Sequence, residues 1–289
     1  MLSDFQRRWG ISQWVAFLKD QEIPVLPGTR QKLAALREEK RDRIAPKELA
    51  AIVLEDPFLA LKLLRRVEGH RSQTLSQETT TALGAVLQAG VDDLMRTVNN
   101  AVLANESLPG LHGCAIRNIV AARIARDWAS MRADISAEEV TLATLLSESG
   151  ELLLWHFAPE LPQNAIDELN SGRALRTLQA QQQATGFSFK QMNLALVEAW
   201  ALPQLITQLI RGFDTPRANI ARIAGDTARH IITHPENPAL PADLVNIKQI
   251  IHGVSIESLI APLPISDDYK AQVLLAVAED NYSKDFTGL

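Results

Sequence analysis

The chain has 289 residues, a formal net charge of −5, 46% hydrophobic residues and 22% charged residues. This composition is typical of a globular protein with a sizeable core, and it excludes disordered and fibrous chains. The basic clusters are short (Arg7-Arg8, Lys40-Arg41-Asp42-Arg43 and Arg65-Arg66), whereas an extended nucleic-acid footprint needs clustered cations unopposed by acids. We therefore do not expect nucleic acid as a partner.

Cys114 is the only cysteine, which excludes a disulfide within the chain and fits a reducing compartment. The first residues lack the basic start and apolar run of a secretory signal. No stretch approaches the roughly 20 apolar residues needed to span a bilayer. We expect a cytoplasmic protein with no membrane partner.

The first third of the chain predicts a short amphipathic piece and then helices separated by prolines. Two prolines within residues 23–28 require an extended segment, because each fixes φ and removes a donor. A helix is expected over 29–39, and Pro46 suits the first turn of the next one. Asp56-Pro57 is an N-cap followed by proline at the first helical position. A helical pair covers 80–104 and breaks near Gly90.

The remainder is also helical by its apolar spacing. Residues 116–128 place apolar side chains every three or four positions, which is typical of a half-buried helix. Ser136 and Glu139 form a capping-box pattern that opens one helix running to Pro159. Further helices are separated at 171–172, 185–186 and 202–203, and later at Pro235, Pro238, Pro241 and Pro264.

No segment alternates like a strand, and no Asn-Gly or Asp-Gly hairpin turn occurs. The sequence therefore predicts an all-α, two-lobed helical bundle, with a connector at 105–110. We expect an N-terminal helical extension (1–22), a first lobe (23–108), a helical core (109–260) and a C-terminal helix (261–289).

Several of these features resemble, in order, the HDOD (HD-related output domain) family. The resemblance rests on residues 23–27, 55–64, 82–98, 186–187 and 200–203, and it extends over roughly residues 22–260. It implies a helical bundle related to HD-domain metal-dependent phosphohydrolases, used in bacteria as a signalling or output module.

The resemblance also implies where metal ligands would lie. In HD hydrolases, His and Asp side chains hold divalent metals that lower the pKa of bound water. The defining motif is L-L-H-D-I-G-K, and the matching stretch here is Leu-Leu-Ser-Glu-Ser-Gly-Glu at 145–151. Ser147 therefore replaces the histidine, Glu148 the aspartate and Glu151 the lysine. A hydroxyl is a poor divalent-metal ligand compared with imidazole.

The other ligand positions are also substituted. Phe189, or Lys190 in a register shifted by one, replaces a later histidine, and the region near 211–213 contains none. His112 could match the first ligand and Asp226 the last acidic one. We therefore expect no catalytic residue, no metal site and no cofactor. The candidate residues of a degenerate pocket are His112, Ser147, Glu148, Glu151, Phe189 and Asp226.

Three functional hypotheses follow. The first is a non-catalytic signal-transduction module that acts through protein–protein interaction, with signalling proteins as partners. Trp9, Trp14 and Phe58 are its contact candidates if they are exposed, but apolar residues at helical spacing more often belong to the core, and sequence does not separate the two. The second is a sensor of a small ligand, such as a nucleotide, in the degenerate pocket. The third is an atypical metal-dependent phosphohydrolase with ligands drawn from His112, Glu148, Glu151 and Asp226.

Overall fold

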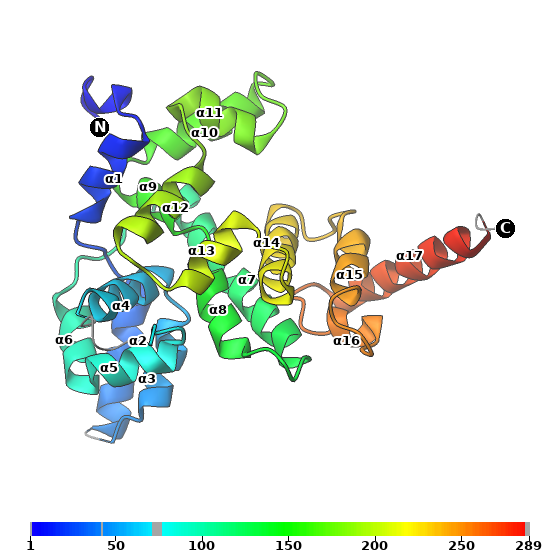
Figure 1. Cartoon of the computed structure of the whole chain (residues 1–289), viewed down its shortest axis with the longest axis horizontal. Helices are drawn as coiled ribbons and strands as arrows, with labels where there is room; N and C mark the ends of the chain where they lie inside the picture. Colours follow the sequence, from blue (N-terminus) through cyan, green and yellow to red (C-terminus); the bar gives the residue numbers. More distant parts are fainter. Residues whose placement is uncertain (1, 42, 71–76, 287–289) are drawn as a thin grey trace.

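The structure is a computed structural model that describes residues 2–41, 43–70 and 77–286, and side chains as far as residue 278. Within these ranges it contains helices and no β-strand, which confirms the predicted all-α fold (Figure 1). Asp42 of the basic cluster at 40–43, and residues 287–289 of the predicted C-terminal helix, lie outside the described residues. None of the described helices is long and apolar enough to cross a membrane.

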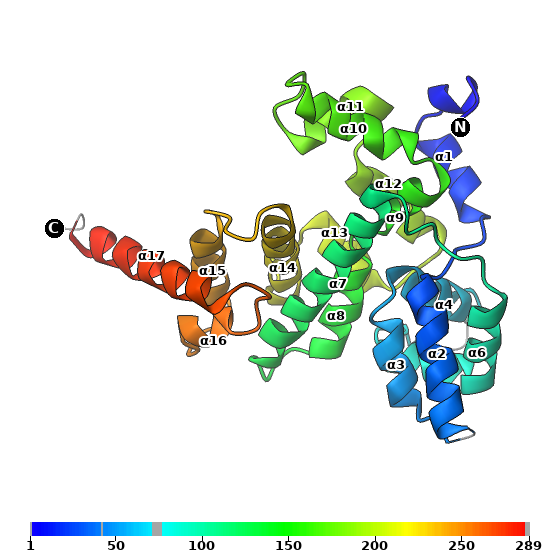
Figure 2. The same cartoon turned by 180° about the vertical axis from the view of Figure 1, so that it is seen from behind.

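The helices fall into two lobes joined by extended segments (Figures 1 and 2). The first lobe contains α2 (Pro27–Lys40), α3 (Pro46–Val53), α4 (Pro57–Gly69), α5 (Ala82–Ala89) and α6 (Val91–Asn100). The second lobe contains the short η1 (Gln6–Arg8), α1 (Ile11–Lys19), α7 (Pro109–Ser130), α8 (Ala137–Leu145), α9 (Ser149–Phe157), α10 (Glu160–Asn170), α11 (Thr177–Thr185), α12 (Phe189–Ala199), α13 (Gln204–Arg211) and α14 (Pro216–Thr233). The chain ends with α15 (Leu240–Lys248), α16 (Ile256–Ile260) and α17 (Asp267–Phe286), which follow α14.

Asp56 caps α4 as predicted, and it also anchors the extended segment before α2. Its buried carboxylate accepts hydrogen bonds from the backbone amides of Phe58 (2.9 Å) and Leu59 (3.0 Å), as expected of an N-cap. It accepts two more from the Leu26 amide (2.8 Å) and the Thr29 hydroxyl (2.7 Å). The four bonds hold the start of α2 against the start of α4.

Two extended segments lie side by side where the chain enters and leaves the first lobe. The amide of Val25 donates to the carbonyl of Val102 (2.9 Å), and the amide of Ala104 donates to the carbonyl of Val25 (2.9 Å), forming an isolated parallel bridge between Val25 and Leu103. Gly90, with φ of 84°, separates α5 from α6 at the predicted position. The connector between α6 and α7 covers residues 101–108, so the last two residues of the predicted connector at 105–110 belong to α7.

The N-terminal helix packs on the second lobe, far along the sequence. The Phe17 and Phe157 rings meet edge to face with their centroids 6.3 Å apart. The indole of Trp200, directly after α12, donates to the carbonyl of Lys19 (3.1 Å). The division of the chain into four segments stays a prediction, but this packing assigns α1 to the second lobe.

The structure decides one alternative that the sequence left open and corrects one prediction. Trp14 and Phe58 are 1% and 0% exposed, so they are core side chains and not contact residues; Trp9 is partly buried against Trp14. Their amphipathic spacing marked the buried face of each helix. Pro241 does not interrupt a helix, because it lies in the first turn of α15, where no intrahelical donor is lost.

Candidate functional site

The stretch that matches the HD motif lies at a break between α8 and α9, and not within one helix as predicted. Helix α8 ends at Leu145 and α9 begins at Ser149. The Ser147 hydroxyl donates to the Thr144 carbonyl (2.8 Å), and the Ser149 hydroxyl donates to the Leu146 carbonyl (2.9 Å). The same two carbonyls also accept the backbone amides of Ser147 (3.1 Å) and Ser149 (3.3 Å), so each serine closes a tight turn at the break.

Asn193 of α12 fixes this break from the other side. Its amide nitrogen donates to the Ser147 carbonyl (2.5 Å), and its amide oxygen accepts from the Gly150 amide (3.1 Å). Gly150 is required here, because an added Cβ would lie 2.7 Å from the Asn193 backbone nitrogen. Packing therefore requires the glycine at position 150, which matches the glycine of the HD motif, although Ser147 stands at the position of the motif's histidine.

An arginine of α7 lies between the two carboxylates of the site. Arg117 Nε is 2.6 Å from a Glu148 oxygen, and its terminal nitrogen is 3.0 Å from a Glu151 oxygen. The three side chains are 19%, 26% and 20% exposed for Arg117, Glu148 and Glu151, so the cluster is largely enclosed. The Trp155 indole also donates to Glu151 (3.3 Å), which orients that carboxylate toward α7.

The charges of this cluster depend on one another. Burial by itself would lower the pKa of Arg117, but the carboxylates of Glu151 and Glu148 outweigh burial and raise it. Burial raises the pKa of Glu151; Arg117 opposes this shift and Glu148 adds to it. The guanidinium is therefore the positive charge that compensates two neighbouring acids.

These residues do not fit a divalent metal. Cys114, Glu148 and Glu151 each offer a ligand atom, and these atoms lie within 4.8 Å of one another. The Arg117 guanidinium, however, already lies within hydrogen-bonding distance of both carboxylates. Burial raises the pKa of the Cys114 thiol well above its ordinary value, and Glu151 adds to the shift, so the thiolate that metals prefer is disfavoured. No metal-dependent step is derived from this site.

Asp226 joins the cluster indirectly, through an arginine of its own helix. Arg229 of α14 is 3.0 Å from Asp226 and 3.9 Å from the outer oxygen of Glu148. A row of alternating charges therefore runs from Glu151 through Arg117, Glu148 and Arg229 to Asp226. It links α9, α7 and α14.

The other two candidates are not part of this cluster. His112 is exposed on the second turn of α7 and has no side-chain hydrogen bond or ion pair with any described residue. Phe189 is the first residue of α12, and its side chain is buried in the hydrophobic core. The structure thus brings Ser147, Glu148, Glu151 and Asp226 into one region and leaves His112 and Phe189 out.

Sequence reasoning missed Arg117 and Asn193. Arg117 follows Cys114 by three positions, so both side chains lie on one face of α7. A charged residue within the apolar pattern at 116–128 was the available signal that a carboxylate would face it. Asn193 offered no comparable signal, because its role depends on a contact with α9.

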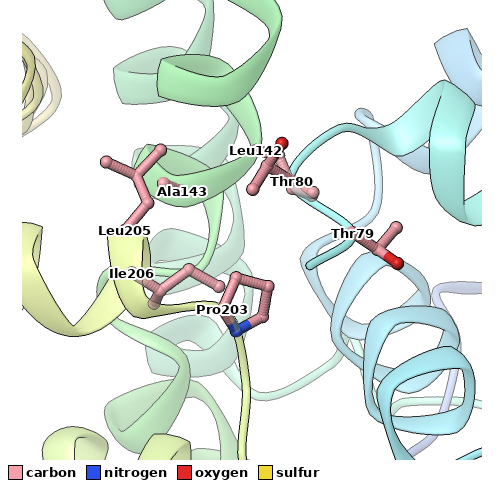
Figure 3. A pocket seen from close by; sticks show the side chains of 7 residues that line it. All are labelled: Thr79, Thr80, Leu142, Ala143, Pro203, Leu205 and Ile206. Carbon is pink, nitrogen blue, oxygen red and sulfur yellow. The ribbon is translucent and has the colours of Figure 1, made fainter. Parts of the chain in front are cut away.

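Residues 77–81, which precede α5 in the first lobe, contact the second lobe. Figure 3 shows the side chains around a narrow gap at this junction, which has no room for a water molecule. It is lined by Thr79, Thr80, Leu142, Ala143, Pro203, Leu205 and Ile206. Beside it, the Thr80 hydroxyl donates to Glu139 (2.8 Å), and the amide of Gln204 donates to Glu78 (2.9 Å). Glu139 therefore serves this junction and not the predicted capping box.

A larger groove of about 950 Å³ lies on the first lobe, between α4, α5 and α6. Most of the residues that line it have polar side chains, among them Arg66, Thr79, Gln88 and Asp93. Neither this groove nor the gap in Figure 3 is lined by any of the six candidate residues.

The comparison of the sequence with family models identifies the class of the protein. The family model of the HDOD domain matches residues 23–216, which is more than half of the chain. The chain belongs to the HDOD domain family. No curated protein matches its sequence.

Solved structures resemble the chain in fold. The crystal structure of a virulence factor from Campylobacter jejuni subsp. jejuni matches with a TM-score of 0.68 at 16% identity, covering 88% of this chain and 96% of that chain. The MmoQ response regulator from Methylococcus capsulatus str. Bath matches with a TM-score of 0.62 at 14% identity, covering 89% of this chain and 99% of that chain.

Proposed function

We propose that the protein is a non-catalytic signalling module that acts by binding other proteins. The observation that carries this proposal is the Arg117 guanidinium between Glu148 and Glu151. A positive charge is already supplied by the chain at the point where an HD hydrolase would use a metal ion. Ser147 matches the position of the motif's histidine, so that position supplies no imidazole, and the Ser147 hydroxyl donates to the Thr144 carbonyl.

Two further findings support a signalling role. Membership of the HDOD family places the chain among proteins with this helical scaffold. One protein of similar fold is a response regulator, the MmoQ protein. Protein–protein binding requires an exposed contact surface on a stably folded scaffold, and the hydrophobic core of this chain stabilises such a scaffold.

The test of this proposal is metal analysis combined with a thermal melt. We expect purified protein to contain no stoichiometric iron, manganese or zinc, and EDTA to leave its melting temperature unchanged. Phosphate release from p-nitrophenyl phosphate and from cyclic dinucleotides should equal the buffer blank with added Mn²⁺. Stoichiometric metal, or Mn²⁺-dependent hydrolysis that is lost in Glu148→Gln, would overturn the proposal.

The groove on the first lobe favours a second candidate, a sensor of a small polar ligand. Its volume of about 950 Å³ lies at the upper end of the range of ligand sites, and its lining offers a guanidinium, hydroxyls and amides. A ligand that binds only the folded protein raises its melting temperature. A thermal-shift panel with nucleotides and cyclic dinucleotides tests this candidate, and an unchanged melt throughout would remove it.

A further inference from the structure

Helices α10 and α11 form a hairpin at one end of the molecule, away from the first lobe and from α15–α17 (Figures 1 and 2). Helix α11 packs chiefly against α10, through the small buried side chains Ala174 and Ala180. Its opposite side is exposed to solvent. There Leu175 and Leu178 are 87% and 55% exposed, which makes them two of the most exposed large apolar side chains described.

The segment 167–190 around these leucines carries three cations and two acids, Asp167 and Glu168 of α10, and Glu168 pairs with Arg173. Residues 169–197 form the longest stretch of the chain without an aspartate or glutamate, although the protein as a whole carries a net charge of −5. Helix α11 itself contains no charged residue. Arg176 precedes it, and Lys190 follows near its end, where the Phe189 amide donates to Gln181 (2.9 Å).

Both cations are exposed and without an ion-pair or hydrogen-bond partner among the described residues. Arg173 differs, because it forms a two-pronged ion pair with Glu168 (2.9 and 3.0 Å). The surface formed by Leu175, Arg176, Leu178 and Lys190 is named the α11 face. It combines exposed apolar area with uncompensated positive charge.

We infer that the α11 face docks a segment of another protein that presents apolar side chains flanked by carboxylates. Leucines that are exposed beside unpaired cations gain from burial, and complementary charge selects the partner and speeds its association. This inference rests on the proposed function, since it gives the binding module a contact surface and a class of partner.

Other occupants fit the face less well. In a two-fold contact between copies of this chain the same patch meets itself, so Arg176 and Lys190 would approach the same cations of the other copy. A nucleic-acid site neutralises many phosphates, whereas this face offers two free cations between uncharged leucines and glutamines. A protein segment with apolar side chains flanked by carboxylates would bury the two leucines and pair with the two cations of the α11 face.

The experiment uses the full chain and a fluorescent synthetic peptide that forms an amphipathic helix with a leucine stripe flanked by glutamates. A matched peptide carries lysine in place of every glutamate. In fluorescence anisotropy at low salt, we expect the glutamate peptide to bind and the lysine peptide not to bind. Arg176→Glu should weaken binding about tenfold, because a favourable charge contact becomes a repulsive one. Leu178→Ser should weaken it about threefold or more, through lost apolar burial.

The matched control is Leu275→Ser, which removes a 67% exposed leucine on α17 and should leave binding unchanged. All three positions are exposed, so circular dichroism should show folded variants. The inference is overturned if the glutamate peptide does not bind, if both peptides bind equally, or if Leu275→Ser weakens binding as much as Leu178→Ser.

Two further outcomes would assign the face to another occupant. Sedimentation that shows a wild-type dimer and a Leu178→Ser monomer would assign it to a second copy, and duplex DNA binding lost in Arg176→Glu would assign it to nucleic acid. Either result overturns the inference. Neither affects the metal and hydrolysis assays, so failure of the α11 face is distinguishable from failure of the proposed function.

Discussion

Replacing Arg117 with methionine should destabilise the fold, because it leaves two enclosed carboxylates without their cation. Glu148 and Glu151 lie 2.6 and 3.0 Å from the guanidinium. Removing one member of a buried ion pair costs about 3–5 kcal/mol. About a fifth of each side chain remains in contact with solvent, which screens the charges, so we take the lower end, about 3 kcal/mol.

That loss is measurable by denaturant unfolding and by calorimetry. With an unfolding entropy of about 2.1 cal/mol/K per residue, about 3 kcal/mol lowers the melting temperature of a chain of this length by roughly 5 °C. Methionine keeps most of the volume of the arginine side chain, so the fall in melting temperature reports chiefly the lost charge.

Two controls separate charge from packing. Arg229→Met removes a 48% exposed arginine that is 3.9 Å from the same Glu148, and it should cost no more than about 0.5 kcal/mol. Adding Glu148→Gln and Glu151→Gln to Arg117→Met removes the repulsion and should recover most of the loss. A melting temperature of Arg117→Met equal to that of Arg229→Met, or a triple variant no more stable than the single one, would refute the reasoning.

Three other changes have defined outcomes. Gly150→Ala places a Cβ 2.7 Å from the Asn193 backbone nitrogen and should cost about 3 kcal/mol in urea unfolding; a cost below that of an exposed Gly→Ala change would contradict the close contact. Asp56→Ala removes four hydrogen bonds and should cost at least about 3 kcal/mol by the same measurement, whereas a wild-type midpoint would exclude the anchoring role. Glu55 has a pKa below its ordinary value of 4.5, because Lys32 and Arg123 favour its charged form. Its contribution is therefore present above pH 4.5 and lost as the pH falls through the lowered pKa, so Glu55→Gln should lose stability less steeply in acid than wild type; equal acid profiles would contradict this.

The parts of the fold that sequence could predict are those encoded by neighbouring residues. Asp56-Pro57 and Gly90 mark helix boundaries because a cap, a fixed φ and a left-handed backbone act within one turn. The all-α class follows from apolar spacing in the same way. The HD-motif resemblance likewise located Glu148 and Glu151, because a motif is local.

The parts that sequence could not predict depend on distant contacts. The periodicity at 140–154 continues through the break between α8 and α9, so only Asn193, 46 positions from Ser147, shows where the chain turns. The pairing of Arg117 with Glu148 spans 31 positions. The apolar spacing of Trp14 and Phe58 fits either a contact surface or the core. Which one holds depends on the helices that pack over them, and both side chains are buried.

The docking of α1 on α12 has a consequence for synthesis of the chain. The Trp200 indole that binds the Lys19 carbonyl is made 181 residues after it. At translation speeds of about 5–20 residues per second, that interval is roughly 10–40 s. The contact between α1 and α12 therefore cannot form until the intervening helices have been made, so the docking of α1 is completed late in synthesis.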